Sequence, residues 1–203
     1  GTKSTTISIV DAESAPTVTL ATNDSSLAED EADATLTATL SGKTYAAVTI
    51  DLSTSGTATE GTDYAAISNI TISAGATTGT AAFNPTDDSL YDAASAESAT
   101  VAIGTVSGGS ASAGSSDQSV AITITDTESA PSVQLSSNAN SIDEDSASTI
   151  TLTATLSGTT YENVVVSIGT SGAAGEGTDY SNVGDITISA GNTTGTTTFD
   201  PID

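Results

Sequence analysis

The sequence repeats itself with a period of about 115 residues, and this periodicity constrains the fold more than any other feature. The segment Thr37-Ala38-Thr39-Leu40-Ser41-Gly42 recurs 116 residues later, as do Gly-Thr-Asp-Tyr at 61–64 and Ile-Thr-Ile-Ser-Ala-Gly at 70–75. Ser14-Ala15-Pro16 recurs after 115 residues. A period of this length fits one ordinary domain per repeat. We therefore expect residues 15–129 to form a complete repeat, residues 130–203 an incomplete second repeat without its final strands, and residues 1–14 the last strand of a preceding repeat.

Apolar side chains alternate with Thr and Ser over short stretches of each repeat. Leu36, Ala38 and Leu40 alternate with Thr, and the same period of two recurs at 48–52, 70–72, 101–103, 120–124, 152–156 and 164–168. This period indicates strands with one buried and one solvated face, and clusters of Gly, Asn, Asp and Ser separate them. About seven short strands in each repeat predict an all-β fold of tandem antiparallel β-sandwich domains of the immunoglobulin-like kind.

The composition excludes several classes of function. The chain has 2 basic and 26 acidic residues, and it contains no His or Cys. A protein with a net charge of −24 lacks the cations that hold nucleic-acid phosphates or an anionic membrane surface. Without His and Cys there is no Ser-His-Asp triad, Cys nucleophile, Cys/His zinc site or haem ligand. We therefore expect no enzymatic activity, no nucleic-acid partner and, since apolar runs are short, no membrane insertion.

The acidic residues gather at the ends of the expected strands. They lie at 29–33, 60–63, 87–92 and 126–128 of the first repeat. Alternate loops of a sandwich meet at the same end, so these segments can converge on one pole, where their charges would repel one another. A Ca²⁺ ion, which takes 6–8 oxygen ligands, would remove that repulsion. From clustering alone, the calcium hypothesis and the alternative of an acidic surface that serves solubility or adaptation to a salty medium are equally supported.

Several motifs in a fixed order resemble the Calx-β repeat. A Glu-containing start, Thr-Ala-Thr-Leu-Ser, Gly-Thr-Asp-Tyr, Ile-Thr-Ile-Ser-Ala-Gly, Asp-Asp and a strand that ends Asp-x-Glu follow one another, and the resemblance covers nearly the whole chain. It implies a seven-stranded β-sandwich that binds calcium at one pole. Some members regulate sodium–calcium exchangers, and many others form tandem arrays in large bacterial surface or secreted adhesins.

The resemblance also implies which residues bind Ca²⁺. In the first repeat it assigns the side chains of Glu29, Asp63, Asp87, Asp88, Asp92, Asp126 and Glu128 and the backbone carbonyl of Leu90. In the second repeat it assigns Glu144, Asp179 and Asp203. At the start of the chain, Asp11 and Glu13 match Asp126 and Glu128 and would serve a repeat upstream. The family's final acidic run is often several consecutive acids, whereas this one is Asp126-Thr127-Glu128, which implies fewer ions or a lower affinity.

The repetition and the resemblance together predict a structural role. We expect a calcium-binding extender repeat of a large extracellular adhesin or surface filament, stiffened by calcium at the domain pole and junction. One alternative is a calcium-sensing regulatory domain of the exchanger type, and another is a filament subunit assembled by strand complementation. A glycosidase with two carboxylates is disfavoured, because only seven aromatic residues are available to stack on a sugar.

The same features predict the partners and the location of the chain. We expect contacts with neighbouring repeats of the same chain, and lateral or end-to-end self-association, in an extracellular or cell-surface setting. The counterparts of residues 88–115 are absent between the end of the second repeat and the pattern at the start of the chain. We therefore expect these residues to be a window on a longer polypeptide. The alternative is that residues 5–10 of one chain fill the open sandwich of another.

Overall fold

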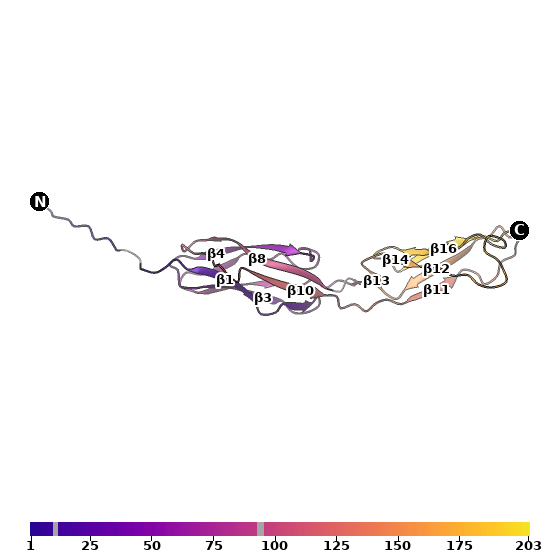
Figure 1. The fold of residues 1–203 in the computed structure, drawn as a ribbon, viewed down its shortest axis with the longest axis horizontal. Coiled ribbons are helices and arrows are strands. Elements are labelled where there is room, and N and C mark those ends of the chain that lie inside the picture. The colour runs from indigo at the N-terminus through magenta and orange to yellow at the C-terminus, as the bar shows by residue number, and fades with distance from the viewer. Residues whose placement is uncertain (10–11, 93–95) are drawn as a thin grey trace. The chain divides into compact units, whose positions relative to one another are not determined.

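A computed structural model describes residues 1–9, 12–92 and 96–203 of the chain (Figure 1). These residues form sixteen strands and no helix, so no helix among them is long and apolar enough to cross a membrane. The strands are β1 (Thr17–Thr22), β2 (Ser26–Ala28), β3 (Ala34–Leu40), β4 (Val48–Gly56), β5 (Ile70–Ile72), β6 (Thr78–Phe83), β7 (Leu90–Tyr91), β8 (Glu97–Ser107), β9 (Ser112–Ala113), β10 (Ser119–Thr125), β11 (Val133–Ser137), β12 (Ile150–Leu156), β13 (Thr159–Thr160), β14 (Val164–Val166), β15 (Ile186–Ile188) and β16 (Thr194–Phe199). The expectation of an all-β chain is confirmed.

The strands fall into two compact units, of which the first contains β1–β6 and β8–β10. Its four-stranded sheet has the order β6-β3-β1-β9, and its five-stranded sheet has the order β2-β10-β8-β4-β5. The long strands of each sheet pair antiparallel, and the short β9 runs parallel to β1. Figure 1 shows the two sheets of this unit lying face to face. The antiparallel β-sandwich predicted for the first repeat is confirmed.

The alternating pattern in the sequence places the core of the first unit between these sheets. In β3, Leu36, Ala38 and Leu40 are buried, whereas the intervening Thr residues are exposed or half-buried. In the other sheet, Ile50 of β4 and Ile122 of β10 are fully buried and belong to the same apolar cluster. Burying one face of each sheet against the other is the main stabilising contribution in a sandwich.

A glycine allows the two sheets to close at one edge. A Cβ atom added to Gly79 in β6 would lie 2.6 Å from the carbonyl oxygen of Thr71 in β5, which belongs to the opposite sheet. In the second unit, a Cβ atom on Gly195 would lie 2.5 Å from the carbonyl oxygen of Thr187. The Gly of the repeated Thr-Gly-Thr segment is therefore needed for close approach of two backbones in both units.

The second unit contains β7 and β11–β16. Its sheets are β11-β12-β16, β14-β15 and β13-β7. A smaller core is formed by Ala154, Leu156, Ile186 and Ile188. Val133 and Leu135 of β11 are 47 % and 54 % exposed, although their counterparts Val18 and Leu20 in the first unit are buried. The second repeat thus keeps the strand pairing of the first, while all five residues of its β11 are exposed to solvent.

Residues 1–9 precede β1 and form no strand in the described structure. Ile7 and Ile9 are 81 % and 95 % exposed. That this segment is the last strand of a preceding repeat stays a prediction, because a strand forms only beside a strand with which it pairs, and no sheet of the described chain contains this segment. Val10 and Asp11 lie outside the described residues.

Candidate metal centre

Three of the predicted calcium ligands meet in a carboxylate cluster formed by Glu29, Asp87 and Glu128. One carboxylate oxygen from each residue lies within 4.8 Å of the oxygens from the other two. Glu29 follows β2, Asp87 follows β6 and Glu128 follows β10, so each residue lies just beyond the end of a strand. Glu29 and Glu128 are half-buried and Asp87 is exposed.

The spacing of the cluster fits a calcium ion. Ca²⁺ binds oxygen at about 2.3–2.6 Å, so two ligands on opposite sides of one ion are separated by about 4.6–5.2 Å. Oxygens that all lie within 4.8 Å of one another can therefore contact a single ion with small side-chain adjustments. Carboxylates are hard ligands suited to Ca²⁺, and half-burial of two of them raises the cost of leaving their charges uncompensated. Three ligands of the six to eight that Ca²⁺ requires are thus already close together.

Asp126 organises the backbone beside this cluster. Its Oδ1 accepts a hydrogen bond of 3.1 Å from the amide of Glu128, and its Oδ2 accepts one of 2.8 Å from the amide of Asp92. The carboxylate of Asp126 therefore joins the segment after β10 to the segment after β7. Asp126 is half-buried, as are Asp92 and Glu128. These predicted ligands are neighbours in the structure, although only Glu128 of the three belongs to the carboxylate cluster.

Asp88 and Leu90 lie in the same segment as Asp87. The Oδ1 atom of Asp88 accepts a hydrogen bond of 2.6 Å from the amide of Leu90, which closes a tight turn. Leu90 is half-buried and begins β7. This turn gives the segment a defined shape between two predicted carboxylate ligands, Asp87 and Asp92.

Asp63 lies in the Gly-Thr-Asp-Tyr loop. Its Oδ2 atom accepts a hydrogen bond of 2.5 Å from the amide of Thr59, and its carbonyl oxygen accepts one of 3.0 Å from the amide of Thr86. The second bond joins this loop to the segment that begins with Asp87. The next residue, Tyr64, is buried and stacks on Phe83 with ring centroids 4.8 Å apart. Tyr64 therefore packs beneath the loop that carries Asp63.

The second repeat reproduces the Gly-Thr-Asp-Tyr loop. Asp179 accepts a hydrogen bond of 2.6 Å at Oδ2 from the amide of Gly175, and its carbonyl accepts one of 3.0 Å from Ile202. Glu144 and Asp179 line the same hollow beside Phe199. Asp203, the counterpart of Asp87, is exposed at the last position. The predicted ligands Glu144, Asp179 and Asp203 do not form a cluster of three carboxylates in the described structure.

Two features of the loops escaped the sequence analysis. The carboxylate of Glu176 accepts hydrogen bonds from Val183 N at 2.7 Å and Thr170 Oγ1 at 3.2 Å. Residues 43–45 contain a buried hydroxyl side chain, Thr44, and adjoin two hollows of the first unit. In the sequence, the only feature that draws attention to residues 43–45 is their equivalence to residues 159–161 at an offset of 116.

Two β-sandwich repeats, the first with converging acidic strand ends, define a class of tandem modules suited to binding a divalent cation. The sequence model of the Calx-beta domain matches residues 11–128 and 126–198. The chain therefore belongs to the Calx-beta domain family and contains two copies in tandem. Tandem Calx-beta domains commonly bind calcium, and Calx-beta domains are non-catalytic. All three residues of the carboxylate cluster fall within the first match.

Solved structures of the same kind resemble the chain only distantly. The apo form of the Calx CBD1 domain is 15 % identical, with 55 % of this chain and 99 % of that chain covered and a TM-score of 0.46. CBD12 from CALX1.2 is 14 % identical, with 91 % and 75 % covered and a TM-score of 0.46. A two-domain protein of unknown function from Bacteroides fragilis is 8 % identical, with 93 % and 85 % covered and a TM-score of 0.39. No curated protein matches the chain.

Proposed function

We propose that the chain is a calcium-binding structural repeat of a larger extracellular or cell-surface protein. The observation that carries the calcium part is the convergence of Glu29, Asp87 and Glu128 within 4.8 Å. The chain has 26 acidic and 2 basic residues, so it offers few cations of its own to balance these carboxylates. A bound Ca²⁺ would supply two positive charges where the ends of three strands meet.

Calcium at this position would stabilise the folded chain. Extracellular calcium modules have Kd values of about 10⁻⁴–10⁻³ M, and the partial exposure of the cluster favours that range. At about 10 mM calcium, a site of this affinity that is absent from the unfolded chain adds about 1.4–2.7 kcal/mol to the free energy of unfolding. Since Glu29, Asp87 and Glu128 come from three separate segments, the ion would also restrain those segments relative to one another.

Thermal unfolding with calcium or chelator tests the calcium site. We expect calcium to raise the melting temperature of the full chain by roughly 5–10 °C. Asp87→Asn removes one charged ligand and should abolish most of this increase. Asp33→Asn is the matched control, because Asp33 is an exposed acid of the same repeat that lies outside the cluster. An equal melting temperature in calcium and in chelator, or an equal loss in both variants, would contradict the proposed site.

The extender role rests on the tandem organisation. Two copies of one domain follow each other with matches that meet at residues 126–128, so little chain separates them. Short connections restrict bending between domains, a property suited to holding an adhesive or anchoring region away from a cell. An antibody against this chain should label intact, unpermeabilised source cells or their medium. Labelling that requires permeabilisation would contradict the extracellular adhesin or filament role while leaving calcium binding intact.

A further inference from the structure

The second unit shows what residues 43–45 lack in the first. Its strand β13, formed by Thr159 and Thr160, pairs in parallel with β7, with Thr159 opposite Leu90 and Thr160 opposite Tyr91. The amide of Tyr161 donates a hydrogen bond of 3.0 Å to the carbonyl of Tyr91. The hydroxyl of Thr159 donates one of 2.7 Å to the carbonyl of Ser89. Strand addition thus occupies the edge formed by residues 159–161.

Residues 43–45, at an offset of 116, are held in the same conformation. Thr44 Oγ1 donates to Ala46 O at 2.7 Å, as Thr160 Oγ1 donates to Glu162 O at 2.8 Å. Gly75 N donates to Thr44 O at 2.9 Å, and its counterpart Gly191 N donates to Thr160 O at the same distance. Thr44 and Thr160 are the two buried polar residues of the described chain. The first unit therefore presents a preformed copy of β13.

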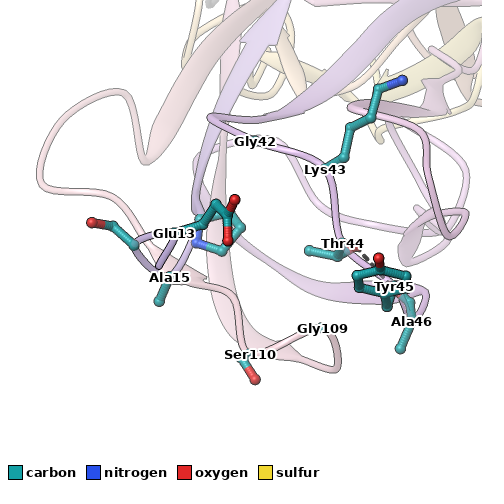
Figure 2. A pocket seen from close by; sticks show the side chains of 11 residues that line it. Glu13, Ala15, Gly42, Lys43, Thr44, Tyr45, Ala46, Gly109 and Ser110 are labelled. Atoms are coloured by element: carbon teal, nitrogen blue, oxygen red, sulfur yellow. Dashed lines mark hydrogen bonds between the residues drawn. The ribbon is translucent and has the colours of Figure 1, made fainter. Parts of the chain in front are cut away.

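No strand of the described chain covers this copy. Tyr45 is 107 % exposed, compared with 56 % for Tyr161, and its amide has no hydrogen-bond partner among the described residues. A pocket of about 410 Å³ opens beside residues 43–46, and Glu13 lies on its other side (Figure 2). Glu13 is the counterpart of Glu128, which lies next to Asp87 at the start of the β7 segment. The pocket therefore has the surroundings in which a β7 segment is bound.

The charge of Lys43 indicates which kind of strand would bind to residues 43–45. The segment 87–92, Asp-Asp-Ser-Leu-Tyr-Asp, contains three carboxylates. Lys43 is one of only two basic residues in the chain, and it replaces Thr159 at the position that meets this segment in the second unit. An ammonium group at this edge favours an acidic strand over a neutral one. Glu13-Ser14-Ala15-Pro16 and Glu128-Ser129-Ala130-Pro131 are identical, so a repeat joined upstream would reach the edge through the same linker.

We propose that residues 43–45 form a docking edge for the Ser-Leu-Tyr segment of a second copy of this repeat, joined upstream in the same polypeptide. The docked segment adds a short parallel strand, in which its Tyr carbonyl accepts the amide hydrogen of Tyr45. Lys43 lies beside the flanking Asp residues. This inference rests on the proposed role as a repeat of a longer array, and it gives that role a specific contact between consecutive repeats.

An extended chain tests the docking edge. Residues 1–129 followed directly by residues 15–203 contain one additional repeat behind the natural Glu-Ser-Ala-Pro linker. With ¹⁵N-tyrosine labelling, the full chain has five tyrosine amides, so the added copies of Tyr45, Tyr64 and Tyr91 can be assigned. We expect the amide of the inner Tyr45 to exchange with solvent at least about tenfold more slowly than that of the outer Tyr45, and similarly to Tyr161. Equal rapid exchange of both Tyr45 amides would overturn the inference.

Charge variants and the unmodified chain complete the test. In the extended chain, Lys43→Glu in the inner copy should return the exchange of Tyr45 to the outer rate, whereas Lys3→Glu should not. Protection that survives Lys43→Glu would overturn the role of charge. In the unmodified chain, Tyr161 should exchange more slowly than Tyr45, and equal rates would overturn the pairing on which the inference is based. Dimers with a protected Tyr45 would assign the edge to another chain instead.

Calcium titration of the same samples separates the two proposals. Calcium binding without protection of the inner Tyr45 would overturn the docking edge alone. Protection of Tyr45 without calcium binding would overturn the calcium site alone.

Discussion

Truncation of one leucine in each repeat should affect stability very differently. Leu20 and Leu135 occupy equivalent positions on β1 and β11, but Leu20 is 2 % exposed and Leu135 is 54 % exposed. Leu→Ala removes three carbon atoms, each contributing about 0.8 kcal/mol when buried, so full burial at Leu20 corresponds to about 2.4 kcal/mol. A closed cavity raises this cost toward about 3–5 kcal/mol. At Leu135 less than half the side chain is buried and no closed cavity forms, which leaves about 1 kcal/mol.

Urea unfolding of the full chain measures this difference. Circular dichroism reports the loss of strands, and the backbone amides of Tyr64 and Tyr180 report separately on the first and second units. Leu20→Ala should lower the midpoint for Tyr64 with an unchanged dependence on urea concentration. Leu135→Ala should produce a small shift confined to Tyr180. A cost at Leu135 equal to or larger than that at Leu20 would refute the burial argument.

Two further predictions concern a glycine and a turn. Gly79→Ala should destabilise the first unit by about 1–3 kcal/mol, because its Cβ would collide with the carbonyl of Thr71. Gly42→Ala is the control and should not destabilise the unit, because a Cβ there meets nothing within 4 Å. Equal urea midpoints for the two variants would contradict this prediction. Asp88→Ala should remove most of the thermal stabilisation by calcium in the first repeat, and in chelator it should lower the free energy of unfolding by about 1 kcal/mol through loss of the hydrogen bond to Leu90. Asp33→Ala should leave both the calcium response and the stability in chelator unchanged. A full calcium response in Asp88→Ala would exclude Asp88 from the site.

The sequence alone was sufficient for the fold class and the family. A period of two in segments such as 34–40 places the apolar side chains on one face of each strand, and a sheet can bury that face by packing on another sheet. The repetition at 115–116 residues then predicts the number of domains, and the order of the motifs predicts Calx-beta membership. The fold class, the number of domains and the family can be predicted from the sequence because they depend on the spacing of residues along the chain.

The tertiary structure decided which acidic side chains meet. Glu29, Asp87 and Glu128 are separated by many residues, and their proximity depends on where three strands end in space. Equal local patterns also led to unequal burial, since Leu20 is enclosed by the opposite sheet and Leu135 is not. Residues 43–45 and 159–161 adopt the same backbone turn, but only the latter meet β7. Whether a preformed edge has a partner depends on contacts distant in sequence, which no local pattern encodes.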